Sequence, residues 1–194
     1  MDFDFVVVNY KHTDETARLL DQLHKTFHHP YTVTVIDNTL DNRGFAKATN
    51  LGASLGSAEI IGFLNPDILL VDGWADATIA TLAENSNIVI CGPRLDDGYG
   101  WPRDLRTSGI KNWVCGACYF VRRDFFESRG GFDERYYFTH EETDLIRQAE
   151  SLGYDVLAVD TEQPLIKHIR HDSVFHGEQL RAAAEQYRRK WATR

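Results

Sequence analysis

Short apolar runs alternate with amphipathic segments along most of the chain. Runs rich in β-branched and aromatic residues predict strands over residues 3–10, 31–36, 59–64, 88–91, 113–121 and 155–159. Apolar residues at helical spacing predict helices over residues 13–27, 45–55, 72–83, 123–129, 141–152 and about 174–192. Strands that alternate with helices favour an α/β fold, with a mainly parallel sheet covered on both faces and a mixed edge.

Length and composition fit one domain over residues 1–194. Hydrophobic residues make up 43% of the chain and charged residues 26%, which is ordinary for a soluble globular protein. Residues 96–112 show no clear period and are expected to form a loop. The start is acidic rather than basic, and no apolar run approaches the ~20 residues that span a bilayer. We therefore expect a cytoplasmic protein without a signal peptide or transmembrane segment.

The net charge of −8 disfavours broad nucleic-acid binding, which depends on neutralising phosphates. One basic stretch near the C-terminus runs against this charge and contains Arg181, Arg188, Arg189, Lys190 and Arg194. A solvated helix face is the favoured interpretation of this stretch. Contact with an anionic acceptor or a membrane surface is the alternative.

The three cysteines, Cys91, Cys115 and Cys118, are expected to be reduced, because their number is odd and no signal peptide is predicted. Cys115 and Cys118 have the spacing of a redox motif or of half a zinc site. No second pair completes a zinc site, and the segment has the pattern of a strand rather than a helix start. We therefore interpret all three as small buried thiols.

Polar residues follow three predicted strands: Asn9 after the first, Asp37-Asn38 after the second and Asn65-Pro66-Asp67 after the third. Asn, Asp and Pro are common in turns, so each group alone is most simply interpreted as a turn. Ligands of open α/β sheets bind at the carboxyl ends of the strands, so the joint occurrence favours a site at this edge. Asp37 could accept a hydrogen bond from the imide N–H of uracil or thymine there. Asp67 could bind Mg²⁺ or Mn²⁺.

A dense acidic cluster, His140-Glu141-Glu142-Thr143-Asp144, opens the helix predicted over residues 141–152. Glu142 shares a helical stripe with apolar residues further along, namely Leu145, Ile146, Ala149 and Leu152, so it is expected to face into the protein. Burial would raise the pKa of its carboxyl toward that of a general base. The alternative is favourable placement of acids at a helix N-terminus.

Most of the eight histidines are expected to be surface or packing residues. His168 differs in its position. It follows a proline and the run Leu165-Ile166-Lys167, beyond the last predicted strand. On the residues alone, packing remains the favoured interpretation of His168, and a metal ligand is the alternative.

Seven motifs make the chain resemble a known family. They read VVVNY, VIDN, NRGFAKATNLG, GFLNPD, WVCGACYFVRRDFF, GGFDERYYFTHEETDL and HIRHDS. In order and rough spacing they resemble the family-2 inverting glycosyltransferases, particularly the rhamnosyltransferase-like branch, from the first strand to about Ser173. The resemblance implies a single-domain GT-A fold. It also implies transfer of a hexosyl or deoxyhexosyl group from a nucleoside-diphosphate sugar.

The resemblance implies roles for individual residues as well. Glu141-Glu142 is similar to the acidic dyad of the family, whose second member is the catalytic base. Asp67 would hold Mn²⁺ or Mg²⁺, and His168 resembles the late histidine that can complete the metal site. The residues expected at the donor are Asn9, Asp37, Asn38, Arg43, Gly44, Asn50, Asn65, Gly116, Ala117 and Arg170.

The reaction that the resemblance implies needs no covalent intermediate. Glu142 would deprotonate an acceptor hydroxyl, which attacks the anomeric carbon as the metal-bound diphosphate leaves. The donor is expected to be a UDP-, dTDP- or GDP-linked sugar. The acceptor is expected to be a glycan or a lipid-linked sugar, with a hydroxymethylated base in phage DNA less favoured. The alternative functions are a non-catalytic sugar-binding module and a metal-dependent nucleotidyltransferase, which would want a Gly-rich phosphate loop.

Two stretches depart from the pattern of this family. After Asp37-Asn38 the family has a further helix and strand, whereas here residues 39–41 cross directly to the glycine segment. One α/β unit is therefore expected to be missing. Arg170-His171 replaces the small residues before Ser173, and these cations would help to neutralise the diphosphate or a charged acceptor.

Overall fold

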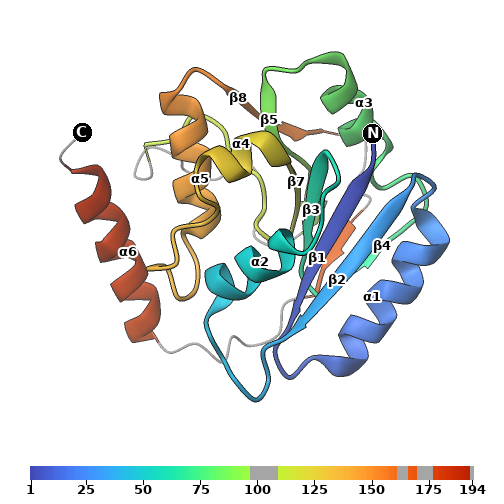
Figure 1. The fold of residues 1–194 in the computed structure, drawn as a ribbon, viewed down its shortest axis with the longest axis horizontal. Helices are drawn as coiled ribbons and strands as arrows, with labels where there is room; N and C mark the ends of the chain where they lie inside the picture. The colour runs from blue at the N-terminus through green and yellow to red at the C-terminus, as the bar shows by residue number, and fades with distance from the viewer. Residues whose placement is uncertain (97–108, 161–165, 170–176, 193–194) are drawn as a thin grey trace.

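A six-stranded mixed sheet forms the centre of the molecule (Figure 1). The computed structural model describes residues 1–96, 109–160, 166–169 and 177–192. The strand order is β2–β1–β3–β7–β5–β8. The bounds are β1 (Phe3–Asn9), β2 (Tyr31–Asp37), β3 (Ile60–Leu64), β5 (Ile88–Pro93), β7 (Cys118–Arg122) and β8 (Asp155–Val159). The predicted α/β class, with a mainly parallel mixed sheet flanked by helices, is confirmed.

Strand β7 runs antiparallel to both of its neighbours, β3 and β5, inside the sheet. The pairs β1–β2, β1–β3 and β5–β8 are parallel. The prediction that the change of direction lies at an edge was therefore wrong. Residues 113–117, which were expected to open this strand, form a loop and turn instead. As a result β7 starts beside the end of β3, where Leu64 pairs with Cys118.

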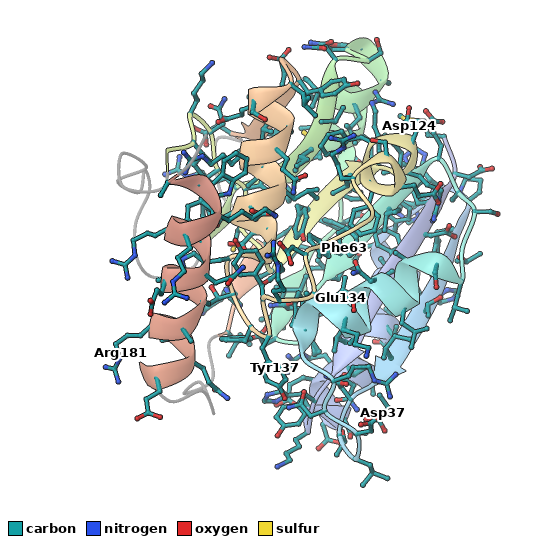
Figure 2. The ribbon with its side chains drawn as sticks, turned by 60° about the vertical axis from the view of Figure 1, so that its left-hand side comes forward. Asp37, Phe63, Asp124, Glu134, Tyr137 and Arg181 are labelled. Carbon is teal, nitrogen blue, oxygen red and sulfur yellow. The ribbon has the colours of Figure 1, made fainter. Side chains whose placement is uncertain are left out.

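Helices cover both faces of the sheet. α1 (Thr13–Thr26) and α3 (Asp76–Glu84) pack on one face, and α2 (Phe45–Ser54), α4 (Arg123–Ser128) and α5 (Glu141–Ser151) pack on the other. α6 (Gly177–Trp191) lies outside α5, on the side away from the sheet (Figures 1 and 2). Among the helices that the structure describes, none is long and apolar enough to span a bilayer.

Two predicted boundaries shift. α3 begins at Asp76 rather than at residue 72, because residues 72–75 form turns. α6 is described from Gly177, so the predicted start at residue 174 falls outside the described residues. The same holds for most of the loop predicted over residues 96–112.

A second sheet, with the order β4–β9–β6, was not predicted. Its strands are β4 (Ile68–Leu70), β6 (Leu95–Asp96) and β9 (Ile166–His168). They are only two or three residues long, which is too short for a hydrophobic period to mark them. β4 follows β3 after a three-residue turn, and its Leu70 N–H donates to the Gln22 side chain of α1 over 3.2 Å.

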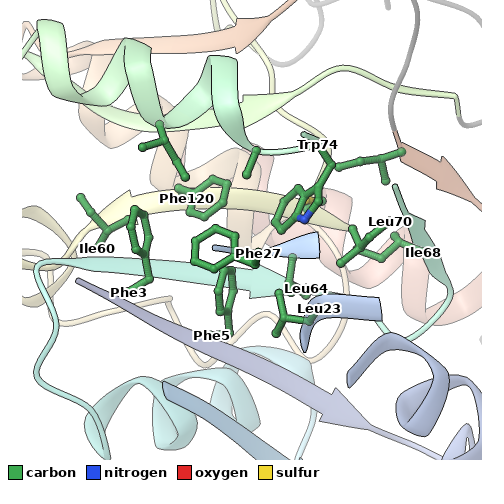
Figure 3. Close-up of a cluster of buried hydrophobic side chains, with 14 of the residues drawn as sticks. Phe3, Phe5, Leu23, Phe27, Ile60, Leu64, Ile68, Leu70, Trp74 and Phe120 are labelled. Carbon is green, nitrogen blue, oxygen red and sulfur yellow. The ribbon is translucent and has the colours of Figure 1, made fainter. Parts of the chain in front are cut away.

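Alternate side chains of β1 enter two separate cores. Phe5 and Val7 point toward α1 and α3, whereas Val6 points toward α2. In the first core, which Figure 3 shows, the ring of Phe5 lies edge-on to Phe27 with centroids 4.8 Å apart and lies 6.3 Å from Trp74. Because a shift by one residue would move these rings out of the core, their burial fixes the register of β1.

β2 forms one edge of the sheet. Residues 38–44, all of them described, connect it to α2 and contain no strand. Val33 and Val35 are 38% and 39% exposed, so one face of β2 is only partly covered. Because residues 38–44 cross directly to α2, the described part of the sheet has only β1 and β2 on this side of β3.

A buried ion pair joins β1 to α4. Arg123 Nη2 donates to Asp4 Oδ2 over 2.7 Å, and the two side chains are 11% and 7% exposed. Burial would raise the pKa of the Asp4 carboxyl, but hydrogen bonds from Thr32 and Ala58 together with the Arg123 charge hold it below its usual value. Arg123 also donates to the carbonyls of Ala53 and Ala58, so one guanidinium ties several segments together.

Replacing Arg123 with alanine should lower the free energy of unfolding by about 3–5 kcal/mol, because it leaves a buried carboxylate without its partner. Glu127→Ala is the matched control, since it removes a 63% exposed partner of the same guanidinium. The control should change stability by no more than about 1 kcal/mol. Urea denaturation followed by circular dichroism measures both variants. Equally small effects would contradict the role of Arg123 as a tie.

Candidate active site

Asp67 and His168 meet at the small sheet, although they are 101 positions apart in the chain. β4 and β9 pair antiparallel with Ile68 opposite His168, and the Ile169 N–H donates to the Asp67 carbonyl over 2.8 Å. This ladder brings His168 Nε2 to 3.2 Å from Asp67 Oδ2. The side chains of His168 and Asp67 are 13% and 20% exposed, so the pair is largely shielded from water.

The surroundings of this pair fit a divalent cation. Burial would lower the pKa of the His168 imidazole, but the hydrogen bond with Asp67 and the nearby Cys115 thiol raise it to about 9. Asp67 Oδ1 and His168 Nδ1 are buried and have no hydrogen-bond partner among the described residues. Two ligand atoms of one cation lie about 3 Å apart, which matches the separation of the paired atoms.

Two side chains alone do not complete a cation site. The described residues contain no group of three or more His, Cys, Asp or Glu side chains that could hold a metal ion. Mg²⁺ is often bound by one or two protein carboxylates and takes its other oxygens from water and substrate phosphates. The Asp67–His168 pair therefore fits a cation that is bound together with a phosphorylated substrate.

The turn that precedes β7 contacts both ends of the candidate site. The Asn65 N–H donates to the Ala117 carbonyl over 2.9 Å, which joins the turn to the Asn-Pro-Asp segment. The same turn carries Cys115, whose nearby thiol helps to raise the pKa of the His168 imidazole. Gly116 lies against Glu142, because a Cβ at position 116 would stand 3.3 Å from Glu142 Cγ. The structure thus brings the predicted metal ligands and the predicted base close to the turn of residues 115–117, beside the carboxyl end of β3. This region is called the corner below.

All three cysteines are free and buried. Burial raises the pKa of the Cys91 thiol to about 12 and that of Cys118 well above its usual value. Both therefore stay protonated at neutral pH, as expected for small buried thiols. Cys115 is also buried, but its contact with His168 gives it a position that the sequence analysis did not foresee.

Glu141 and Glu142 open α5 at this corner. Glu141 is 5% exposed, and burial raises the pKa of its carboxyl well above the usual value, with the Glu142 charge adding to the rise. Glu142 is half-buried, and its Oε1 accepts a hydrogen bond from the Thr143 hydroxyl over 3.1 Å. The dyad therefore combines a buried neutral acid with a more accessible carboxylate.

The prediction that Glu142 faces into the protein on the apolar side of α5 was partly wrong. The buried face of α5 is centred on Glu141, Leu145 and Ala149, and Glu142 lies at its margin. Leu152, at the far end of the predicted stripe, is 53% exposed. One residue is a rotation of about 100° on a helix, so a period of 3.6 read from a few apolar residues leaves neighbouring positions hard to distinguish.

Two consecutive left-handed residues lead into the dyad, Thr139 with φ 63° and His140 with φ 71°. This conformation is uncommon for residues with side chains, and such strain gathers at functional sites. Burial lowers the pKa of the His140 imidazole, although the Glu142 charge opposes the shift. The Asp144 N–H donates to the His140 carbonyl over 2.8 Å, so the strained pair sets the direction in which α5 presents its first carboxylates.

The ends of β1 and β2 place the predicted nucleobase residues side by side. Asn9 pairs with Asp37 in the parallel ladder, and its amide lies 3.5 Å from the Asp37 carboxylate. Asp37 is exposed at this edge (Figure 2), and hydrogen bonds from the Thr39 hydroxyl and N–H lower the pKa of its carboxyl. Asn38 is 2% exposed, and its side chain accepts from the Arg43 N–H over 3.1 Å. Its side chain therefore shapes the loop.

The glycine segment packs against Tyr137. Gly44 has φ 86°, and a Cβ at this position would lie 2.8 Å from the Tyr137 ring, so only glycine fits. Arg43 donates to Asp41 over 3.0 Å and lines a groove of about 930 Å³ beside α2. The backbone of Arg43 therefore lies close to Asn38 at the end of β2, whereas its side chain lines the groove beside α2.

Asn50 lines the same groove and is held there. Its amide donates to the Phe132 carbonyl and accepts from the Phe132 N–H, each over 2.9 Å. A Cβ on Gly131 would lie 2.6 Å from the Asn50 oxygen, so the two segments are in close contact. The structure therefore gives Asn50 a role in joining α2 to the chain before α5. Arg170, the remaining predicted donor residue, lies outside the described residues.

The sequence analysis left a central carboxylate, Asp144, without a role. Asp144 is 1% exposed and accepts from Trp191 Nε1 over 2.8 Å and from Lys190 Nζ over 2.6 Å. The Tyr136 hydroxyl and the Gln148 amide donate to it as well. Asp144 thus holds α6 onto α5. Its burial depends on contacts with Tyr136 and with Lys190 and Trp191 of α6, which no local pattern in the sequence marks.

The chain is similar to a known family and to several curated proteins. The family model described as Glycosyl transferase family 2 matches residues 1–152. The O-antigen biosynthesis protein RfbC of Myxococcus xanthus is 26% identical over 202 residues, which cover 86% of this chain and 15% of the relative. The N-acetylglucosaminyl-diphospho-decaprenol L-rhamnosyltransferase of Mycobacterium tuberculosis is 38% identical over 84 residues, which cover 38% of this chain and 27% of the relative. The matched segments thus span 15% and 27% of these two relatives.

Solved structures share the fold. The mannosyltransferase PcManGT of Pyrobaculum calidifontis, in complex with GDP-Man and Mn²⁺, has a TM-score of 0.74 at 14% identity and covers 99% of this chain and 64% of that chain. S. aureus TarS 1–349 in complex with UDP has a TM-score of 0.69 at 14% identity and covers 99% of this chain and 72% of that chain. At such identities the likeness concerns the fold alone.

Replacing Glu141 with glutamine should remove a pH dependence of stability. Burial favours the protonated acid, so the folded wild type binds this proton more tightly than the unfolded chain does. The resulting penalty is absent below the ordinary pKa of 4.5 and grows as the pH rises toward the raised pKa of the folded state.

The Tm of Glu141→Gln relative to wild type should therefore increase as the pH rises above 4.5 in thermal denaturation. Glu178→Gln, at an exposed position, serves as the control and should follow wild type at every pH. A constant Tm difference between Glu141→Gln and wild type across this range would contradict a buried neutral Glu141.

Proposed function

The chain belongs to glycosyl transferase family 2, and we propose that it is a metal-dependent inverting glycosyltransferase. It moves a hexosyl or deoxyhexosyl group from a nucleoside-diphosphate sugar to an acceptor hydroxyl. The observation that carries the proposal is the turn before β7, which contacts His168 through its thiol and Glu142 through Gly116. A pair suited to a cation and a carboxylate suited to a base thus border the same corner.

The donor binds across the carboxyl ends of β1, β2 and β3. Asp37 is exposed there and can accept the N–H of a base, while Asn9 lies beside it. The neighbouring structures contain UDP and GDP-Man, and one relative is named as an L-rhamnosyltransferase. These names support a UDP-, dTDP- or GDP-linked sugar as the donor of this chain.

Asp67 and His168 would hold Mn²⁺ or Mg²⁺ beside the diphosphate. When bound, the cation acts as a Lewis acid that stabilises the departing diphosphate. The buried Asp67 oxygen without a partner among the described residues supports this role, because such a group is costly unless something binds it. Asn65 and Ala117 fix the Asn-Pro-Asp turn and so hold Asp67 in place.

Glu142 acts as the general base. The Thr143 hydroxyl donates to its Oε1, which leaves Oε2 to take the proton of the acceptor hydroxyl. The oxygen of that hydroxyl forms a bond to one face of the anomeric carbon while the bond to the diphosphate breaks on the other face, so the configuration inverts. Glu141 stays neutral through burial and adds no second negative charge beside the base.

A surface glycan or a lipid-linked sugar is the proposed acceptor. The relatives carry the names of an O-antigen biosynthesis protein and of a diphospho-decaprenol rhamnosyltransferase, which supports this class. The net charge of −8 disfavours the alternative, a hydroxymethylated base in DNA. A non-catalytic binding module would release no nucleoside diphosphate, and a nucleotidyltransferase would release pyrophosphate, so product analysis separates these functions.

Mn²⁺ added with UDP or GDP should raise the Tm of the wild-type protein, and Asp67→Asn should abolish the rise. A ligand at about 100 times its Kd stabilises the folded state by about 2.7 kcal/mol through mass action. Asp72→Asn is the matched control, because Asp72 also lies 3.2 Å from a histidine, His28, but at 83% exposure. Excess EDTA should reverse the shift. A Mn²⁺ shift that survives in Asp67→Asn would place the cation elsewhere.

Glu142→Gln should lower turnover by about 10²–10⁴-fold and preserve donor binding, because glutamine keeps the shape of the side chain but cannot accept a proton. Release of nucleoside diphosphate from UDP-, dTDP- and GDP-linked sugars with Mn²⁺ measures turnover. Glu84→Gln, at an exposed position on α3, is the control and should match wild type. Full turnover in the Glu142 variant would remove this residue from the mechanism.

A further inference from the structure

A pocket of about 420 Å³ opens between α6 and the chain that leads to the dyad. One wall consists of Arg135, Tyr137 and Phe138, and the other consists of Gln179, Ala182 and Gln186 of α6. Its volume lies in the range of about 300–1,000 Å³ that small-molecule sites occupy. We propose that this pocket, the α6 pocket, holds the acceptor and that the acceptor is a saccharide. The inference rests on the proposed function and adds the place at which its saccharide acceptor binds.

The α6 pocket lies beside residues 38–45, here called the donor loop, and beside the segment that leads to the proposed base. The Tyr137 hydroxyl donates to the Asn42 carbonyl over 3.1 Å, and its carbonyl accepts from the Phe45 N–H over 2.7 Å. Phe138 precedes Glu142 by four residues, which is at most about 14 Å of extended chain. Figure 2 shows Tyr137 between α6 and the edge that carries Asp37. The pocket therefore borders the segment that connects the loop before α2 to the proposed base.

The helical wall of the pocket is fixed to the helix that carries the base. Asp144 binds the Trp191 indole over 2.8 Å, and the ring of Tyr187 lies 5.6 Å from the ring of His140. Asp144 and Glu142 belong to the same turn of α5. The pocket and the base therefore form one unit, which is what positioning of an acceptor hydroxyl requires.

The lining of the pocket matches the surface of a sugar ring. Tyr137 is 42% exposed, and together with Phe138 it offers flat apolar faces against which the C–H faces of a pyranose can pack. The amides of Gln179 and Gln186 each carry donors and an acceptor, the combination that hydroxyl groups satisfy. Ala182 has no side chain beyond Cβ and leaves the space between these groups open.

The charges of the lining disfavour a phosphate as the main ligand. Among the described residues that line the pocket, Arg135 is the cation, and its guanidinium already donates to both oxygens of Asp133 over 2.8 and 2.6 Å. An anionic lipid headgroup or a nucleic-acid backbone would need further cations. A neutral polyhydroxylated ligand needs none, so the observations favour a saccharide over a nucleic acid.

Saturation-transfer difference NMR tests the proposal with and without UDP and Mn²⁺. The probes are methyl α-D-glucopyranoside, methyl α-D-mannopyranoside, methyl α-L-rhamnopyranoside and methyl N-acetyl-β-D-glucosaminide. Wild type should transfer saturation to at least one of them. Ala182→Trp fills the pocket and should abolish the signal. Arg181→Trp adds the same bulk to a neighbouring exposed residue that points away from the molecule in Figure 2, and it should keep the signal.

A second variant tests the amides without filling the pocket. Gln179→Ala combined with Gln186→Ala should weaken binding of the same glycoside about tenfold, because two modest hydrogen bonds are lost. A signal that survives in Ala182→Trp would overturn the location. Absence of signal for all four glycosides with wild type, or binding of oligothymidylate in their place, would overturn the class of ligand.

The outcome is independent of the test of the proposed function. The NMR signal needs no turnover, whereas the proposed function fails if Mn²⁺ with nucleotide produces no shift in Tm and no nucleoside diphosphate is released. Thermal denaturation of the three variants confirms that each remains folded before its binding is compared with wild type.

Discussion

Two strands of three residues hold the chemistry of this molecule together. The pairing of β4 with β9 returns the chain after β8 to the end of β3 and brings His168 to Asp67. The entropy of closing a loop grows only with the logarithm of its length, roughly as (3/2)RT ln n, so a separation of 101 positions is not prohibitive for a short ladder. The backbone ladder aligns residues 67 and 168, and the side chains of Asp67 and His168 then need only one rotamer each to meet.

Burial assigns different charge states to acids that lie at the same corner. Glu141 is enclosed, and burial raises the pKa of its carboxyl well above the usual value, whereas the side chain of Glu142 is only half-buried. Gly116 allows Glu142 to lie close to the turn, because a Cβ at position 116 would be only 3.3 Å from Glu142 Cγ. Asp67 is shielded too, but it faces His168, so its negative charge is balanced. The corner can therefore hold a base and a cation without two unpaired carboxylates in contact.

The sequence predicted the parts of the molecule that long apolar runs and strand ends encode. The alternation of strands and helices, and the polar ends that carry Asp37 and Asp67, are of this kind. It missed β4 and β9, since three residues show no period. It did not predict that β7 is an antiparallel strand inside the sheet, because the direction of a strand depends on the end of the sheet at which the chain enters it. It did not identify Glu141 as the buried acid, because adjacent helical positions differ only in rotation. The role of Asn50 depends on Phe132, a contact between distant segments that no local pattern marks.

The segment from Tyr136 to Asp144 connects the two substrates of the proposed reaction. Tyr137 is bound to the donor loop by its backbone and by its hydroxyl, and Gly44 allows the close contact. Asp144, seven residues later, fixes α6 and hence the other wall of the α6 pocket. The spacing between donor and acceptor is therefore set by backbone bonds and buried side chains rather than by mobile surface groups. Because a misplacement of about 1 Å can cost two orders of magnitude in rate, a catalyst gains from this placement. The same argument explains why strain at residues 139–140 is tolerated directly before the base.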